Sequence, residues 1–86
     1  HKYNCASMFK RAEGVGQITH IAGLERLLAE EGEHVCVVDL LPIGAPRRDW
    51  RATLLSDGMI IYRHMDLDET LRITHRFANE LRMYAG

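Results

Sequence analysis

The chain has 86 residues, of which 47% are hydrophobic and 27% are charged, and its formal net charge is −1. A chain this short makes one domain, residues 1–86, with a core that buries about 60–65% of the surface exposed on unfolding. The composition excludes disorder and a membrane-spanning helix, and 12 acidic against 11 basic residues disfavour nucleic-acid binding through phosphate contacts.

The two cysteines, Cys5 and Cys36, have no metal-type spacing. The start of the sequence also lacks the apolar segment of a signal peptide. We therefore expect a cytoplasmic protein without a structural disulfide.

Residues 1–16 show no sustained hydrophobic period, and two glycines interrupt them at positions 14 and 16. From Gln17 onward, apolar residues recur at steps of three and four, and Gly32 follows as a helix end. This spacing predicts an amphipathic helix over residues 17–31. Its apolar positions are Ile18, Ile21, Leu24, Leu27 and Leu28.

The segment "HVCVVDLL" contains an apolar, β-branched run without alternation. Such a run is typical of a strand buried on both faces, so we expect a core strand over residues 35–41 with Cys36 inside it. Pro42, Gly44 and Pro46 then predict a loop.

The next segment, "PRRDWRATLLSDG", has two interpretations. It can be a helix over residues 46–57 that begins at Pro46, or one arm of a hairpin that turns at Asp57 and Gly58. The helix is preferred, because proline suits the first helical turn and the step from Trp50 to Leu54 is helical. A strand over residues 59–63 follows.

The last segment carries the clearest helix signal. Asp66 and Glu69 have the spacing of a capping box, and an apolar stripe continues behind them. The pattern predicts a helix over residues 67–84. The stripe consists of Leu67, Leu71, Thr74, Ala78, Leu81 and Ala85, and Ile73, Phe77 and Tyr84 widen it.

Two segments, "GLERLLAEEGEHVCVVDL" and "PRRDWRATLLSDGMIIYRHMD", carry a family resemblance. Their order resembles the C-terminal half of the minimal nucleotidyltransferases, the small antitoxin-type relatives of the kanamycin nucleotidyltransferases. That family binds a nucleoside triphosphate and Mg²⁺ through a Gly-Ser turn, an Asp-x-Asp pair and a third carboxylate. Residues 1–16 contain neither motif, and the third carboxylate would fall at Cys36, whose thiol is a poor Mg²⁺ ligand. The resemblance therefore implies a catalytically empty domain.

Other polar groups have simple structural interpretations. His64, Asp66, Asp68 and His75 form a conceivable metal cluster, but Asp66 and Asp68 also suit a helix N-terminus, which is the preferred interpretation. The "MDLD" segment imitates an Asp-x-Asp pair, yet it precedes a helix. Cys36 with His34 as a nucleophile, and "EGVGQ" as an anion site, are weaker still. We predict no catalytic residue, no metal and no cofactor.

Two groups of arginines form the candidate interaction surface, one around the single tryptophan and one on the last predicted helix. Trp and Arg are over-represented where proteins bind one another, whereas the alternative interpretation pairs these arginines with nearby acids such as Asp49, Glu69 and Glu80. The candidate residues are Arg47, Arg48, Trp50, Arg51, Arg72 and Arg76.

These elements predict an α+β fold. A small mixed sheet holds strands 35–41 and 59–63 side by side, helices 17–31 and 67–84 cover it, and either an extra N-terminal strand or pairing across a dimer completes it. We expect a non-catalytic interaction domain that is a homodimer or binds a protein partner. The alternative is a Mg²⁺-dependent nucleotide-binding or nucleotidyl-transferring domain completed by another segment or subunit. An accessory domain that binds RNA or DNA is a third, weaker possibility.

Overall fold

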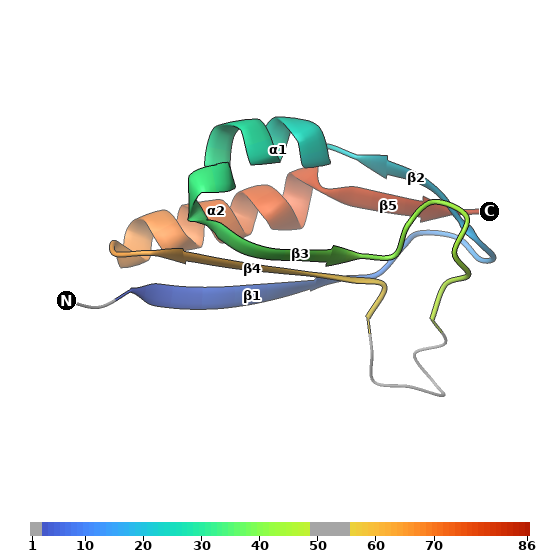
Figure 1. The fold of residues 1–86 in the computed structure, drawn as a ribbon, viewed down its shortest axis with the longest axis horizontal. Helices are drawn as coiled ribbons and strands as arrows, with labels where there is room; N and C mark the ends of the chain where they lie inside the picture. The colour runs from blue at the N-terminus through green and yellow to red at the C-terminus, as the bar shows by residue number, and fades with distance from the viewer. Residues whose placement is uncertain (1–2, 49–55) are drawn as a thin grey trace.

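The computed structural model describes residues 3–48 and 56–86, and the α+β class is confirmed. Figure 1 shows two helices packed on strands, with the N- and C-termini at opposite ends of the long axis. In chain order the elements are β1 (Asn4–Lys10), β2 (Ile18–Ala22), α1 (Leu24–Glu31), the 3-10 helix η1 (Gly32–His34), β3 (Val35–Leu40), β4 (Gly58–His64), α2 (Leu67–Glu80) and β5 (Arg82–Ala85).

The strands form two antiparallel sheets, where the sequence predicted one mixed sheet. The larger sheet has the order β1-β4-β3, and the smaller one pairs β2 with β5. The predicted neighbours, β3 and β4, do lie side by side, and β1 is the extra N-terminal strand that was expected. The central strand is β4, so β3 lies at the sheet edge and not in the middle.

Both helices pack on one face of the larger sheet. Side chains alternate along β1 and β4, so every second residue of these strands points toward the helices. There they meet the inward residues of α1 and α2 in one apolar cluster. Its fully buried members are Leu27, Ile60, Tyr62, Ile73, Phe77 and Leu81, with Ala6, Met8, Ile21, Leu24, Val35 and Leu40 packed around them.

The predicted helix over residues 17–31 is wrong in its first half. Ile18–Ala22 is strand β2, and Leu24–Glu31 alone is helical. Gly23 separates the two, with φ of +87° in the left-handed region that glycine adopts without strain. Apolar residues three apart, such as Ile18 and Ile21, favour a helix, but β2 has an irregular register between Ile18 and His20, and its pairing with β5 overrides the helical pattern.

The predicted helix over residues 67–84 begins where expected and ends early. The side chain of Asp66 accepts a hydrogen bond from the backbone N–H of Asp68 at 2.9 Å, which confirms the cap. The helix stops at Glu80, and the chain continues as strand β5. Pairing with β2 therefore overrides the helical pattern in the last residues.

The apolar stripe of α2 is also corrected. The buried residues of α2 are Thr70, Ile73 and Phe77, while Leu67 and Leu71 are 57% and 51% exposed. Ile73 and Phe77, which were predicted to widen the stripe, thus form the core face. Leu67 and Leu71, which were predicted to begin it, face solvent.

Three further predictions are corrected or fall outside the structure. Strand β3 ends at Leu40, and Cys36 is exposed instead of buried, because β3 is an edge strand. The helix predicted to begin at Pro46 is absent over residues 46–48, and residues 49–55 lie outside the described chain. Within the described ranges, no helix is long and apolar enough to span a membrane.

Candidate functional site

The larger sheet has a second face, which none of the described helices covers. In β1 and β4 it carries the residues that alternate with the core positions, and the pairing register adds residues of β3. We call this surface the open face. Its side chains are Cys5, Ser7, Phe9, Val37, Asp39, Met59, Ile61 and Arg63.

The centre of the open face is largely apolar. In one row across the strands, Ser7 pairs with Ile61 and Ile61 pairs with Val37. In the next row, Phe9 pairs with Met59. Phe9 is 63% exposed and Val37 is 39% exposed. A protein surface ordinarily shows exposed apolar residues singly, whereas here Phe9 lies beside Met59, and Ile61 lies beside Val37. The open face therefore presents neighbouring apolar side chains to solvent.

Opposite charges lie at opposite ends of the open face. Asp39 continues the row of Phe9 and Met59, and Arg63 lies at the other end of β4, paired with Cys5. Both charged residues are exposed, and neither forms an ion pair with another residue of the described chain. The guanidinium carbon of Arg63 lies 4.5 Å from the ring centre of Tyr3.

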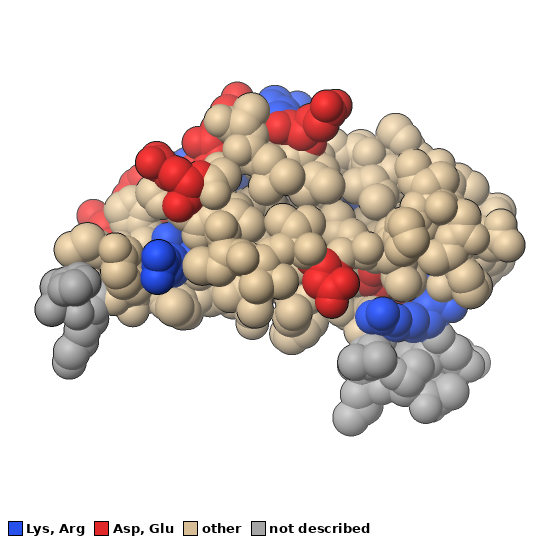
Figure 2. All heavy atoms as spheres, viewed as in Figure 1, with Lys and Arg blue, Asp and Glu red and all other residues tan. Residues whose placement is uncertain are grey.

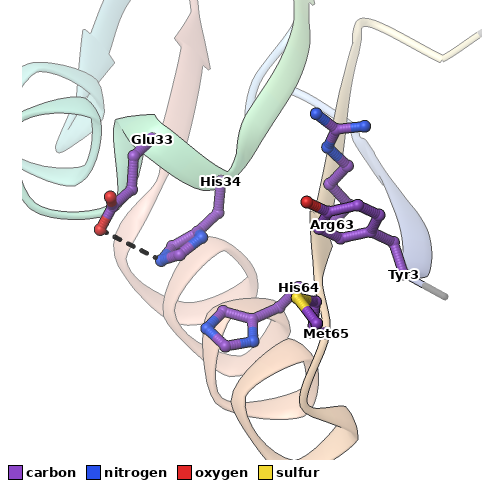
Figure 3. A pocket seen from close by; sticks show the side chains of 6 residues that line it. All are labelled: Tyr3, Glu33, His34, Arg63, His64 and Met65. Carbon is purple, nitrogen blue, oxygen red and sulfur yellow. Dashed lines mark ion pairs between the residues drawn. The ribbon is translucent and has the colours of Figure 1, made fainter. Parts of the chain in front are cut away.

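A shallow pocket of about 230 Å³ adjoins the Arg63 end of the open face (Figure 3). The imidazole rings of His34 and His64 face one another in it, with centres 4.5 Å apart. A carboxylate oxygen of Glu33 lies 3.5 Å from Nε2 of His34. The pocket is lined by Tyr3, Glu33, His34, Arg63, His64 and Met65.

A hydrogen bond to His64 limits its ability to bind a metal ion in this pocket. Nδ1 of His64 accepts the backbone N–H of Asp66 at 2.9 Å, which places the proton of a neutral ring on Nε2. An Nε2 that carries its proton is a donor and not a metal ligand. In residues 3–48 and 56–86, no three His, Cys, Asp or Glu side chains converge as a metal site, so His64, Asp66, Asp68 and His75 do not assemble as one.

The predicted interaction residues Arg47 and Arg48 surround the buried carboxylate of Asp57. Nε of Arg47 donates to Asp57 at 3.0 Å, and the backbone N–H of Arg48 donates to it at the same distance. The backbone N–H of Ala12 adds a third hydrogen bond at 2.8 Å. Burial alone raises the pKa of Asp57, but these hydrogen bonds outweigh it, so the pKa is lowered. Asp57 thereby joins three segments of the chain.

The other predicted pair, Arg72 and Arg76, connects the two helices. Both donate to the buried carboxylate of Glu31, at 2.6 and 2.9 Å. Arg76 also pairs with Glu30 and Glu80. The hydrogen bond from Arg72 is the main cause that lowers the pKa of Glu31. Figure 2 shows the acidic side chains gathered over α1, with basic groups beside them.

Among the described arginines, Arg47 pairs with Asp57, whereas Arg72 and Arg76 pair with Glu31 in a separate cluster. Trp50 and Arg51 lie outside the described residues. The role of these six residues in binding stays a prediction. Sequence reasoning did not find the open face, because its only signal is the alternation in "NCASMFK", where both faces of the strand contain apolar residues.

Comparison with known proteins identifies the fold but no family. No protein-family model matches the chain, and no curated protein matches it. The fold is similar to the crystal structure of L-amino acid ligase from Bacillus licheniformis, with a TM-score of 0.69 and 19% sequence identity. The match covers 95% of this chain and 21% of that one, so this chain spans about a fifth of the ligase. At this identity the similarity shows a shared fold alone.

Proposed function

We propose that this chain is a non-catalytic interaction domain whose open face packs against another protein surface. The observation that carries the proposal is the group of apolar side chains on that face, in which Phe9, on the edge strand β1, is 63% exposed. Burying apolar surface contributes about 25 cal/mol per Å², and aromatic side chains in such positions dominate binding energies. A partner that covers Phe9, Val37 and Ile61 would gain this energy.

The buried acidic groups support a non-catalytic role. Glu31 and Asp57 are the buried carboxylates of the described chain. Glu31 accepts hydrogen bonds from Arg72 and Arg76, and Asp57 accepts them from Arg47 and from the backbone N–H groups of Ala12 and Arg48. A general acid must carry a proton, and a general base must reach a proton on its substrate. These two carboxylates are ionised, buried and already occupied by hydrogen-bond donors of the fold. Their chemistry is that of structural ion pairs.

Site-specific cross-linking tests the proposal. A photo-activated cross-linking residue at Ser7, in the middle row of the open face, should form covalent adducts with a protein surface within reach, whether in purified protein or in cells. The same residue at His75, on the exposed side of α2, is the matched control and should form fewer. Equal adduct yields from the two positions, or none from Ser7, would contradict the proposal.

A second measurement separates a binding surface from a surface needed for folding. Phe9→Ser and Ile61→Thr remove apolar groups from the open face without touching the core. In dilute protein we expect each to change the free energy of unfolding by less than about 1 kcal/mol. Each should nevertheless abolish the Ser7 cross-links. Strong destabilisation of the dilute chain would assign the open face to folding instead.

The fold similarity favours a second candidate, a domain that functions within a larger enzyme. The matching protein is named as an L-amino acid ligase, and this fold makes up about a fifth of it. On this proposal, nucleotide binding or ligation requires groups supplied by another segment or subunit. Saturating Mg²⁺-ATP would then raise the unfolding midpoint by roughly 10 °C, and EDTA would abolish the shift. An interaction domain alone shows no such shift.

Two expectations from the sequence stay proposals. A degenerate nucleotidyltransferase ancestry rests on the packing motifs quoted above. A cytoplasmic location is consistent with the free thiols of Cys5 and Cys36, both of which are exposed.

A further inference from the structure

We infer that the occupant of the open face is a second copy of this chain, docked face to face about a two-fold axis. The inference rests on the proposed function, because it names the partner of the same face. It follows from the positions of Asp39 and Arg63, which make the open face complementary to itself.

The pairing register arranges the open face in three rows across the strands. The middle row contains Ser7, Ile61 and Val37. A row on one side ends at Asp39 on β3, and the row on the other side contains Arg63 on β4. The charges therefore occupy opposite sides of the middle row.

A two-fold axis along the middle row exchanges the two outer rows. Each Arg63 then lies above the row that contains the partner subunit's Asp39. The two residues are displaced sideways by one strand, a spacing of about 4.8 Å. The long side chain of arginine can span this displacement. Because the relation is symmetric, one dimer contains two such ion pairs, and the middle rows, with the apolar side chains of Ile61 and Val37, lie against each other.

Charge disfavours the arrangement in which the two-fold axis runs along β4. An axis along β4 would place Arg63 above Arg63 of the partner subunit, and Phe9 above the partner subunit's Asp39. That arrangement brings like charges together and buries a carboxylate against an aromatic ring, so it costs free energy. The open face thus selects the arrangement in which the outer rows exchange, as in an aligned pair of packed sheets.

The size of the open face sets the expected affinity. Three strands at a spacing of about 4.8 Å, with a rise of about 3.3 Å per residue, give a face of roughly 14 by 20 Å. Interfaces of this size fall below the standard range and are weak. We therefore expect a dissociation constant in the micromolar range or above, with a reversible equilibrium between monomer and dimer.

Sedimentation equilibrium from about 5 µM to 1 mM tests the inference. Wild-type protein should change from monomer to dimer over this range. Ile61→Glu places two carboxylates beside the two-fold axis and should raise the dissociation constant at least tenfold. Leu71→Glu, which makes the same kind of change on the exposed side of α2, is the control and should leave the constant unchanged.

Charge reversal tests the orientation of the two copies. Asp39→Arg and Arg63→Asp should each raise the dissociation constant severalfold, and the double variant should restore it to within about threefold of the wild type. A double variant that is no better than the single ones would overturn the arrangement, as would sensitivity to Leu71→Glu.

A monomer at every concentration would overturn the second-copy inference but not the proposed function. In that case, Ser7 cross-links to a different protein in cells would still support an interaction domain. If those cross-links also fail, the proposed function fails with the inference.

Discussion

The carboxylate of Asp57, which has no exposed surface, accepts a hydrogen bond at 3.0 Å from Nε of Arg47, ten residues earlier in the chain. The same carboxylate holds the backbone N–H of Ala12 at 2.8 Å. It therefore ties the end of β1 and the loop after β3 to the start of β4. An arginine predicted as part of a binding surface is thus also a structural residue.

Replacing Asp57 with Asn should destabilise the protein strongly. The amide has one acceptor oxygen and brings an NH₂ group toward three donors, so Arg47 loses its counter-charge and a buried donor loses its acceptor. We expect the free energy of unfolding to fall by about 3 kcal/mol, as measured by urea denaturation. Asp39→Asn, measured in dilute protein, is the exposed control and should change it by less than about 0.5 kcal/mol. Equal losses for Asp57→Asn and Asp39→Asn would show that the hydrogen bonds to Asp57 do not stabilise the fold.

The ion pairs of the helices should make the protein sensitive to acid. Hydrogen bonds from Arg76 and Arg26 lower the pKa of Glu80 from 4.5 to about 2. Because the pKa is lower in the folded protein, the stabilisation is present above pH 4.5 and is lost as the pH falls toward 2. Glu31 and Asp57 have lowered pKa values as well and act in the same direction.

Urea midpoints measured between pH 6 and pH 2 check this prediction. The midpoint should fall on the acid side of about pH 4.5. Glu80→Gln should have a lower midpoint at neutral pH and a flatter decline with acid. A variant curve that stays parallel to the wild type would contradict the assignment to Glu80.

Local signals in the sequence predicted part of the fold correctly. The side chain of Asp66 caps α2 by accepting a hydrogen bond from the backbone N–H two residues later. This contact requires only the local conformation of the chain. The two strands around residues 35–41 and 59–63 follow from β-branched, apolar runs. Each of these signals depends on residues close in the chain, and at these positions the rest of the fold agrees with it.

The misassigned elements depend on contacts between distant residues. Strands β2 and β5 pair with each other although more than 50 residues separate them, and each was predicted as part of a helix. Their hydrophobic spacing favours a helix, and only the pairing with the partner strand overrides it. Asp57 and Ala12 are likewise 45 residues apart, so no local pattern indicates their hydrogen bond.

The candidate site was predicted even less well than the fold. Arginine and tryptophan signal a binding surface by composition alone, and composition does not reveal that Arg72 and Arg76 both reach Glu31. The open face requires the register of three strands before its residues become neighbours. A surface assembled in this way has no signature in a single segment of the sequence.

Gly23 should resist substitution, and Gly32 should not. Gly23 has φ of +87°, and a Cβ atom there would overlap the carbonyl oxygen of Glu80. Gly23→Ala must therefore strain the backbone or separate the start of α1 from the end of α2. We expect a loss of about 2 kcal/mol or more in the free energy of unfolding.

Gly32→Ala is the matched control for that experiment. Gly32 has φ of −58°, and a Cβ atom there meets nothing within 4 Å. Alanine restricts the unfolded chain more than glycine does, so this variant should be neutral or more stable by up to about 1 kcal/mol. Equal destabilisation by both variants would be inconsistent with the left-handed turn at Gly23.

The core face of α2 is tested by two apolar residues that lie two positions apart. Ile73 is fully buried against the larger sheet, whereas Leu71 is 51% exposed. Ile73→Ala leaves a cavity and should lower the free energy of unfolding by about 3 kcal/mol in thermal or urea denaturation. Leu71→Ala removes a group that water already reaches and should change it by less than about 0.5 kcal/mol. The stripe read from the sequence predicts the reverse order, because it places Leu71 in its leading row and Ile73 at its margin. A larger loss for Leu71→Ala would therefore mean that α2 packs on the sheet with the face that carries Leu71, as the sequence predicted.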